Sequence, residues 1–165
     1  MIDELVATED DVTRAIQEAV RSEALRTKID VMMPVLTGGI WASVLLSQHL
    51  KCDKAFRVEP VRVESYEDNV QKMDPVVTGG PYNNIGEGNT ILIVDDITDT
   101  GKTFDAVIRA LPQNNHFIRF ALVARAPRGK YDVAAFEDIG PGFLYGCGMD
   151  DKGRNRALSS IWRKK

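Results

Sequence analysis

Residues 91–111 read ILIVDDITDTGKTFDAVIRAL, and this stretch decides most of what the sequence predicts. Four apolar residues run into two adjacent carboxylates, Asp95 and Asp96, and a third carboxylate follows at Asp99. Thr-Gly-Lys-Thr (100–103) then opens a segment with the apolar spacing of a helix. Acidic side chains repel phosphates, whereas Gly-Lys-Thr at a helix start is typical of phosphate binding, so one loop combines two opposed chemistries.

The rest of the chain alternates between strand and helix patterns, which predicts an α/β fold with a mainly parallel sheet. Thr8 and Asp11 resemble a helix N-cap pair and begin a helix that we expect to reach about residue 26. Residues 67–89 predict a long loop or a loose hairpin, and loops of that length often serve as lids. The expected strands are 30–36, 55–66, 91–94, 117–124 and 142–149, and the further helices are 40–50 and 103–111.

Length and composition narrow the class of protein. At 165 residues the chain is expected to form one domain, 1–165, and its net charge of −3 argues against a nucleic-acid partner. No apolar run approaches the roughly 20 residues of a membrane span, and the acidic start lacks a secretory h-region, so we expect a cytoplasmic protein. Cys52 and Cys147 fit no metal-site spacing and are interpreted as reduced thiols.

The loop after 91–94 suits a phosphorylated sugar better than a nucleotide triphosphate. A nucleotide P-loop needs glycine where this chain has Asp96, so that interpretation fails. The backbone amides of 99–103, with the hydroxyls of Thr100 and Thr103, can hold one phosphate monoester at the helix start. Asp95 and Asp96 can accept hydrogen bonds from vicinal hydroxyls or hold a metal through water. Ribose 5-phosphate needs both functions side by side; the alternative is that the carboxylates only cap the helix.

Four segments, in order over about residues 30–158, resemble the type I phosphoribosyltransferase family and its 6-oxopurine (hypoxanthine-guanine) branch. ILIVDDITDTGKT resembles the signature that binds phosphoribosyl pyrophosphate (PRPP), and the other segments are VLTGGIWASVLL, VRVESYED and FLYGCGMDDKGRNRAL. The resemblance implies a twisted, mainly parallel sheet flanked by helices, a small hood, a flexible lid over about 66–89 and a C-terminal base-binding segment over about 125–158.

The resemblance also implies a role for each matching residue. Asp99 matches the catalytic carboxylate that handles the proton at purine N7. The PRPP-binding positions are Asp95, Asp96, Asp99, Thr100, Gly101, Lys102 and Thr103. The pyrophosphate contacts are Thr37, Gly38, Gly39, Arg62 and Arg156. The first three form a loop that in this family often contains a non-proline cis peptide. Asp95, Asp96 and Asp150 match magnesium contacts. Ser65 and Tyr66 match the residues at the foot of the lid, and Phe143 and Leu144 match residues that bind the purine.

Plainer interpretations remain open for several of these residues. Lys102 can lie across the helix start as a structural cation, and 37–39 can be an ordinary strand-to-helix turn. Arg62 and Arg156 suit a solvated surface equally well, and Phe143 alone is typical of core packing.

The chain departs from the family pattern at two positions. Thr37 stands where the family usually has Lys or Arg. Ala124 stands where the 6-oxopurine enzymes place a lysine that donates to the purine 6-oxygen, so Arg125 or Lys130 would have to supply that donor.

The expected function is Mg²⁺-dependent transfer of the 5-phosphoribosyl group from PRPP to a purine, hypoxanthine or guanine, with release of pyrophosphate, by a homo-oligomer (dimer or tetramer). The alternatives are transfer to a different base, or a non-catalytic regulator that senses PRPP or nucleotides. Retention of Asp99 speaks against the regulator.

Overall fold

The computed structural model describes residues 2–50, 55–64, 67–68, 71–72, 74–80 and 84–165. Its elements in chain order are β1 (Glu4–Ala7), α1 (Glu9–Ala19), the 3-10 helix η1 (Glu23–Arg26), β2 (Val31–Leu36), α2 (Gly39–His49), β3 (Arg57–Val58), β4 (Val61–Glu64), β5 (Glu67–Asp68), β6 (Gln71–Lys72), β7 (Val76–Gly79), β8 (Thr90–Thr98), α3 (Lys102–Arg109), β9 (His116–Ala124), β10 (Val133–Glu137), β11 (Leu144–Tyr145) and β12 (Ile161–Arg163). No helix in the described ranges is long and apolar enough to cross a membrane.

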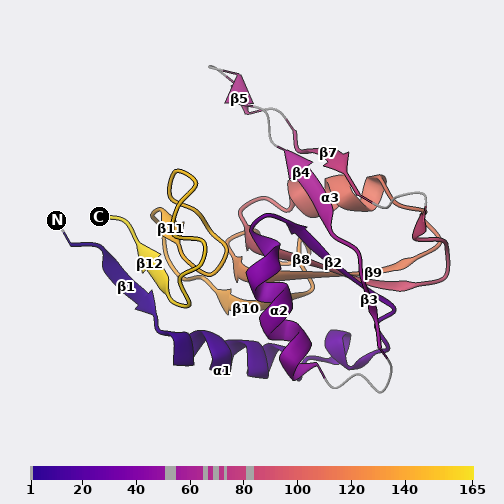
Figure 1. The fold of residues 1–165 in the computed structure, drawn as a ribbon, viewed down its shortest axis with the longest axis horizontal. Coiled ribbons are helices and arrows are strands. Elements are labelled where there is room, and N and C mark those ends of the chain that lie inside the picture. The colour runs from indigo at the N-terminus through magenta and orange to yellow at the C-terminus, as the bar shows by residue number, and fades with distance from the viewer. Residues whose placement is uncertain (1, 51–54, 65–66, 69–70, 73, 81–83) are drawn as a thin grey trace.

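A mainly parallel sheet forms the centre of the molecule (Figure 1). Its strand order is β10-β9-β8-β2-β4-β7, and β3 adds a further parallel pairing to β2. Only β7 runs antiparallel, against β4. The predicted α/β class with a mainly parallel sheet is therefore confirmed.

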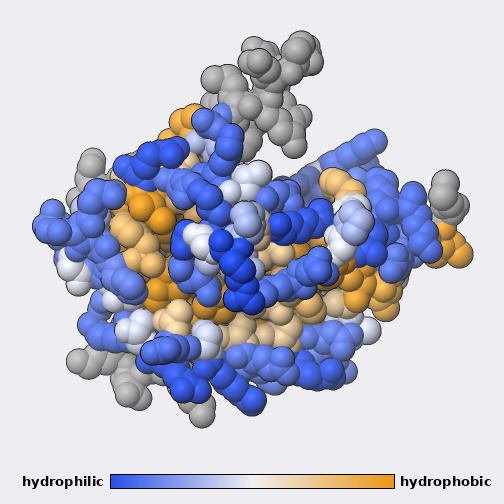
Figure 2. Space-filling model, turned by 180° about the vertical axis from the view of Figure 1, so that it is seen from behind, coloured by the Kyte–Doolittle hydropathy of each residue, from blue (hydrophilic) through white to orange (hydrophobic). Residues whose placement is uncertain are grey.

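Helices cover both faces of this sheet because its central strands are apolar on both sides. α1 and α2 pack on one face through residues such as Ile16 and Leu46, where they meet Leu92 of β8. α3 packs on the other face, with Phe104 in the same apolar cluster as Ile93. Alternate residues of β8 thus serve the two clusters, as the two-residue period of a strand requires. The face seen from behind carries mostly hydrophilic residues with apolar ones between them (Figure 2).

A small antiparallel sheet, β1-β12-β11, joins the two ends of the chain beside the main sheet (Figure 1). β12 lies between the other two strands and pairs Leu144 with Arg163. The segment 142–149 was expected to be one strand, but only Leu144–Tyr145 is extended. Gly146, Cys147 and Gly148 all have positive φ, so the chain cannot continue as a strand.

The first helix is shorter than expected. The capping pair is present, since the Thr8 hydroxyl accepts from the Asp11 amide and the Asp11 carboxylate accepts from the Thr8 amide. The expected end near residue 26 is wrong: α1 ends at Ala19, and Ser22 adopts an extended backbone before η1. This turn buries Leu25 in the core.

Two strand predictions also need correction. The expected strand 55–66 is split into β3 and β4 around Pro60, which has no N–H for a ladder. The expected strand 91–94 extends to Thr98, because β9 pairs with β8 as far as Ala124. The acidic pair therefore belongs to the strand and not to the loop after it.

The region expected to be a loop or hairpin contains the short β5–β6 hairpin and β7. The strands β1, β10 and β12 were not expected from the sequence. Each has five residues or fewer, too short for a clear apolar alternation.

Candidate functional site

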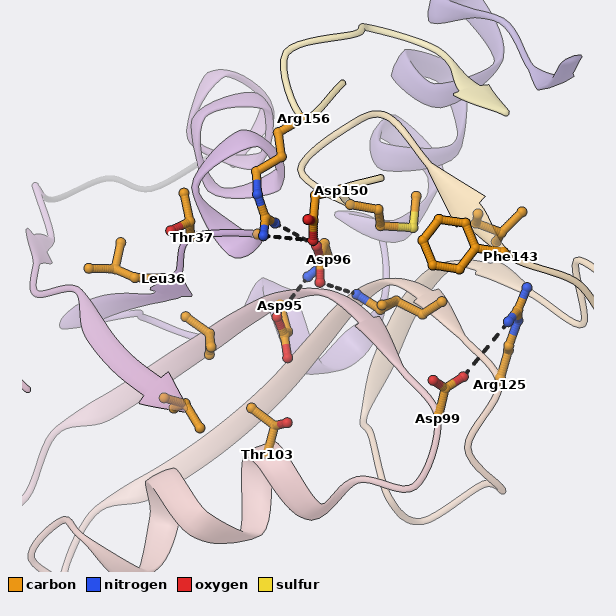
Figure 3. A pocket seen from close by; sticks show the side chains of 16 residues that line it. Leu36, Thr37, Asp95, Asp96, Asp99, Thr103, Arg125, Phe143, Asp150 and Arg156 are labelled. Carbon is orange, nitrogen blue, oxygen red and sulfur yellow. Dashed lines mark hydrogen bonds and ion pairs between the residues drawn. The ribbon is translucent and has the colours of Figure 1, made fainter. Parts of the chain in front are cut away.

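A cavity of about 380 Å³ lies at the carboxyl ends of β2 and β8, facing the C-terminal segment (Figure 3). Open α/β sheets bind their ligands beyond the carboxyl ends of the parallel strands. Eleven of the positions predicted from the sequence line it: Thr37, Gly38, Asp95, Asp96, Asp99, Thr103, Arg125, Phe143, Leu144, Asp150 and Arg156. Segments more than 100 residues apart in the sequence are thus brought to one cavity.

The adjacent carboxylates of Asp95 and Asp96 form its floor. Both are buried, and each is held by a backbone amide: Asp95 Oδ1 accepts from the Asp96 N–H at 3.0 Å, and Asp96 Oδ1 from the Ile97 N–H at 2.7 Å. Burial, together with the charge of Asp96, raises the pKa of Asp95 well above its usual value. Burial also raises the pKa of Asp96, although the Ile97 amide and Arg156 oppose the shift. A cation or a pair of hydroxyl donors would stabilise the charges of these two buried, mutually repelling carboxylates.

Glycines bring the backbone of the loop before α2 directly onto this floor. A Cβ on Gly38 would lie 2.0 Å from Asp96 Oδ2, and one on Gly39 would lie 2.2 Å from the Val94 carbonyl oxygen. From the other side, a Cβ on Gly148 would lie 2.1 Å from the Gly38 carbonyl oxygen. The Leu36–Thr37 peptide just before these glycines is cis. Only glycine fits at these three contacts. Gly38 is the one of the three that lines the cavity, and we call the wall formed by its main chain and that of Thr37 the glycine wall.

Arg156 links the C-terminal segment to the acidic floor. Its Nη1 donates to the Gly148 carbonyl at 2.6 Å and lies 4.0 Å from Asp96 Oδ2. Its Nη2 donates to Asp150 Oδ1 at 2.8 Å (Figure 3). The other oxygen of Asp150 accepts from the Gly153 amide at 2.6 Å. The third predicted metal contact is therefore already hydrogen-bonded within the protein.

The three predicted metal contacts do not form a metal site by themselves. Within the described ranges no group of three or more His, Cys, Asp or Glu side chains could hold an ion. Magnesium usually keeps several waters and binds one or two carboxylates together with substrate phosphates. The buried pair of Asp95 and Asp96 fits that donor set.

The predicted phosphate cradle falls at the start of α3, and part of it faces the cavity. Gly101 has φ +79 and precedes the helix, whose first amides have no partner within a helix. Thr103 faces the cavity, whereas Thr100, Gly101 and Lys102 do not line it. The Lys102 ammonium instead donates to Asp74 at 2.6 Å, with both side chains exposed. Both interpretations of Lys102 therefore stay predictions.

Asp99, Arg125 and Phe143 lie together at the other end of the cavity (Figure 3). Arg125 Nη1 is 4.0 Å from Asp99 Oδ1, and Nη2 donates to the Gly142 carbonyl at 2.6 Å. Its Nε is buried and has no hydrogen-bond partner among the described residues. The Phe143 side chain is 51% exposed, so it does not belong to the core. This end of the cavity therefore presents an aromatic ring, a carboxylate and a guanidinium.

Two predicted groups lie elsewhere. Arg62 does not line the cavity: it pairs with Glu64 at 2.9 Å, while its neighbour Val63 faces the cavity because strand residues alternate. Gly39 packs against β8 behind the loop. The lid residues Ser65 and Tyr66, and Cys52, fall outside the described residues.

Several apolar residues that line the cavity were not predicted from the sequence: Val35, Leu36, Val63, Ile97 and Met149. Nothing distinguishes them from core residues in the sequence. Their place at the carboxyl ends of strands was the available signal.

A match to the phosphoribosyl transferase domain family covers residues 1–151. The chain belongs to this family. Among curated relatives, it is 35% identical over 110 residues to the hypoxanthine-guanine phosphoribosyltransferase of Pan troglodytes, covering 63% of this chain and 50% of that protein. It is 31% identical over 96 residues to the xanthine-guanine phosphoribosyltransferase of Cereibacter sphaeroides, covering 58% of this chain and 53% of that protein. The chain thus spans about half the length of the curated relatives it matches.

The fold agrees with that family over nearly the whole chain. A hypoxanthine phosphoribosyltransferase from Staphylococcus aureus superposes with a TM-score of 0.80 at 21% identity, covering 98% of this chain and 91% of that one. A hypoxanthine-guanine phosphoribosyltransferase from Bacillus anthracis gives a TM-score of 0.75 at 20% identity, covering 100% and 99%. The predicted type I phosphoribosyltransferase fold is confirmed.

Proposed function

We propose that this protein transfers the 5-phosphoribosyl group of PRPP to a purine base, releasing pyrophosphate, in nucleotide salvage. The observation that carries the proposal is that one cavity combines an acidic floor, a glycine wall, a helix start and an exposed aromatic ring. Each of these suits one part of the reaction.

The ribose phosphate would occupy the floor and the start of α3. Asp95 and Asp96 accept hydrogen bonds from the two ribose hydroxyls, and the amides of 99–103 with the Thr103 hydroxyl hold the 5-phosphate. Lys102 would contact the phosphate by leaving Asp74, with which it is paired.

The pyrophosphate would lie against the glycine wall. The loop 37–39 offers main-chain groups there, and Arg156 adds the positive charge that Thr37 lacks. Arg156 donates to Asp150 and to the Gly148 carbonyl, and a guanidinium has further N–H groups that can donate to the leaving group. Stabilising the departing charge is the main demand of this reaction.

A magnesium ion would be held by Asp95 and Asp96, with Asp150 within reach of the same cavity. When bound, it would neutralise the polyanion and its leaving group. The protein's own part is to keep two carboxylates adjacent and buried, where they favour a cation.

The base would stack on Phe143, with the Leu144 backbone reading its edge. As the bond from C1 of ribose to pyrophosphate breaks, a purine nitrogen forms the new bond to C1, and Asp99 takes the proton at N7. Arg125 replaces the absent lysine as donor to the 6-oxygen. Arg125 lines the cavity beside Phe143, which puts its guanidinium where the edge of a stacked base would lie.

The acceptor is the least constrained part of the proposal. Ala124 is buried and does not line the cavity, so it offers the base nothing. Losing a charge-assisted hydrogen bond to a buried oxygen weakens selectivity by about 1.5–3 kcal/mol. We therefore expect hypoxanthine or guanine as the best acceptors, with weaker discrimination than a lysine would give.

The test is chromatographic detection of nucleoside monophosphate from PRPP, Mg²⁺ and a panel of hypoxanthine, guanine, xanthine, adenine and pyrimidines. We expect the 6-oxopurines to react fastest. A clear preference for adenine or a pyrimidine would overturn the choice of acceptor, and no product with any base would favour a regulator that only senses PRPP.

We also propose a cytoplasmic homo-oligomer, a dimer or a tetramer. Ile40 and Val44, one turn apart on α2, are 43% and 55% exposed, which leaves an apolar strip on the helix surface. Light scattering coupled to size-exclusion chromatography should show a mass of two or four chains. A monomer at micromolar concentration would refute this.

A further inference from the structure

We propose that Lys164 is a positioning residue for the acceptor base, because it holds the Phe143 ring from outside the cavity. This inference rests on the proposed function, in which Phe143 stacks on the base. It gives a role to a residue near the end of the chain that takes no part in the proposed reaction itself.

Lys164 contacts Phe143 through both backbone and side chain. Its amide donates to the Phe143 carbonyl at 2.9 Å, and its ammonium lies over the ring, 5.9 Å from the centroid. Phe143 lines the cavity and Lys164 does not, so the ammonium approaches the ring from outside the cavity.

Asp151 fixes the ammonium in this place. Both of its carboxylate oxygens accept from Lys164 Nζ, at 2.8 and 2.7 Å. The Asp151 side chain is 22% exposed, which favours one arrangement of the pair over free rotation in water. Asp151 directly follows Asp150, which lines the cavity, so the pair also ties the ring to the leaving-group side of the site.

The preceding residue, Arg163, supports the same loop. Its guanidinium donates to the Ile139 carbonyl and pairs with Glu4 at 3.3 Å. A Cβ on Gly142 would lie 3.0 Å from Arg163 Cδ, so this side chain packs closely against the loop. The Gly142 carbonyl in turn accepts from Arg125. The end of β12 thus braces both proposed base contacts.

The physical effect is pre-organisation of an exposed ring. Phe143 is half exposed, so little packing fixes its orientation before the base arrives. A cation over an aromatic face attracts its negative quadrupole and restricts the ring, which lowers the entropy that stacking has to remove. An exposed contact of this kind corresponds to about a two- to five-fold change in affinity.

The experiment is a double-mutant cycle on product binding. Dissociation constants for GMP and IMP are measured by calorimetry at fixed Mg²⁺ for wild type, Lys164→Met, Phe143→Leu and the double variant. Lys164→Arg tests rescue by a cation, and Lys165→Met is the matched control for losing one neighbouring charge. KM values for PRPP and for the base are measured in parallel.

We expect Lys164→Met to weaken nucleotide binding and to raise the KM for the base about two- to five-fold, with the KM for PRPP unchanged. Lys164→Met should have no such effect in the Phe143→Leu background, and Lys164→Arg should bind the nucleotides about as well as the wild type. An equal loss in both backgrounds would show that Lys164 acts through Asp151 or through stability, and no loss would show that it has no role; either result overturns the inference. A wild type that forms no product and binds neither nucleotide would overturn the proposed function as well.

Discussion

Replacing Gly38 by alanine tests the glycine wall, because only sterics change. The backbone φ of Gly38 is −61, which alanine adopts without strain. The added Cβ would lie 2.0 Å from Asp96 Oδ2 and 2.4 Å from its Cγ, whereas real Cβ contacts are essentially never under 3.0 Å. The loop and the carboxylate must therefore separate by at least about 1 Å, and Asp96 is buried and held by the Ile97 amide.

Two quantities should change in Gly38→Ala. A displacement of about 1 Å at a reacting group can cost on the order of 10²-fold in rate, so we expect kcat/KM for PRPP to fall by about that factor. Overpacking a filled site costs about 1–3 kcal/mol, which should appear as a lower free energy of unfolding in urea. KM for the base should change least, since Phe143 lies at the other end of the cavity (Figure 3).

Gly79→Ala is the matched control. Among the residues that the structure describes, its Cβ would meet Arg62 Cβ alone, at an ordinary 3.6 Å, away from the cavity. We expect kcat/KM within two-fold of wild type, consistent with a surface change of roughly 0.5 kcal/mol or less. If Gly38→Ala behaves like this control in both rate and stability, the close contact between the loop and Asp96 is not how the site is built.

Four further predictions test other parts of the account. Asp99→Asn should lower kcat by about 10²-fold or more while PRPP affinity largely survives, because an acid/base group is lost; equal loss of both, measured by steady-state kinetics and calorimetry, would indicate a binding role. Activity should stop in excess chelator and return with Mg²⁺, and full rate in chelator would remove the metal assignment. Asp95→Asn should abolish activity yet raise the melting temperature at pH 7. The pKa of Asp95 is raised in the folded protein, so the wild type loses stability as the pH rises above the carboxyl's usual 3.8, and the gain of the variant should vanish near pH 3.8. A lower melting temperature of the variant at pH 7 would contradict the repulsion between Asp95 and Asp96. Arg125→Ala should reduce discrimination among bases by roughly ten- to hundred-fold, whereas a wild-type profile would remove only its donor role.

Much of the fold follows from the sequence because the central strands are long and apolar on both faces. The apolar run ILIV could be placed in the core, and the apolar residues of 40–50 and 103–111 predict helices before and after it in the chain. The short strands β1 and β12 could not be found in this way, because they pair with each other from opposite ends of the chain. β10 pairs with the neighbouring strand β9, but its five residues show no clear apolar alternation. The length of β8 likewise depends on β9, which continues to pair beyond the apolar run.

The site was predictable where residue type alone limits the chemistry. Asp95, Asp96, Asp99 and Thr103 line the cavity because they lie at the carboxyl end of β8, in the turn after it and at the start of α3. Side-chain direction at the margins was not predictable. Lys102 turns to Asp74, a partner 28 residues away in the sequence that no local pattern reveals.

The most direct test of the central claim is a single-turnover experiment with enzyme in excess over labelled PRPP. The account predicts that, with Mg²⁺ and hypoxanthine or guanine, each PRPP yields one nucleoside monophosphate and one pyrophosphate, and that neither forms without a base. Pyrophosphate release that does not depend on a base, or stable PRPP binding with no turnover for any purine, would contradict it.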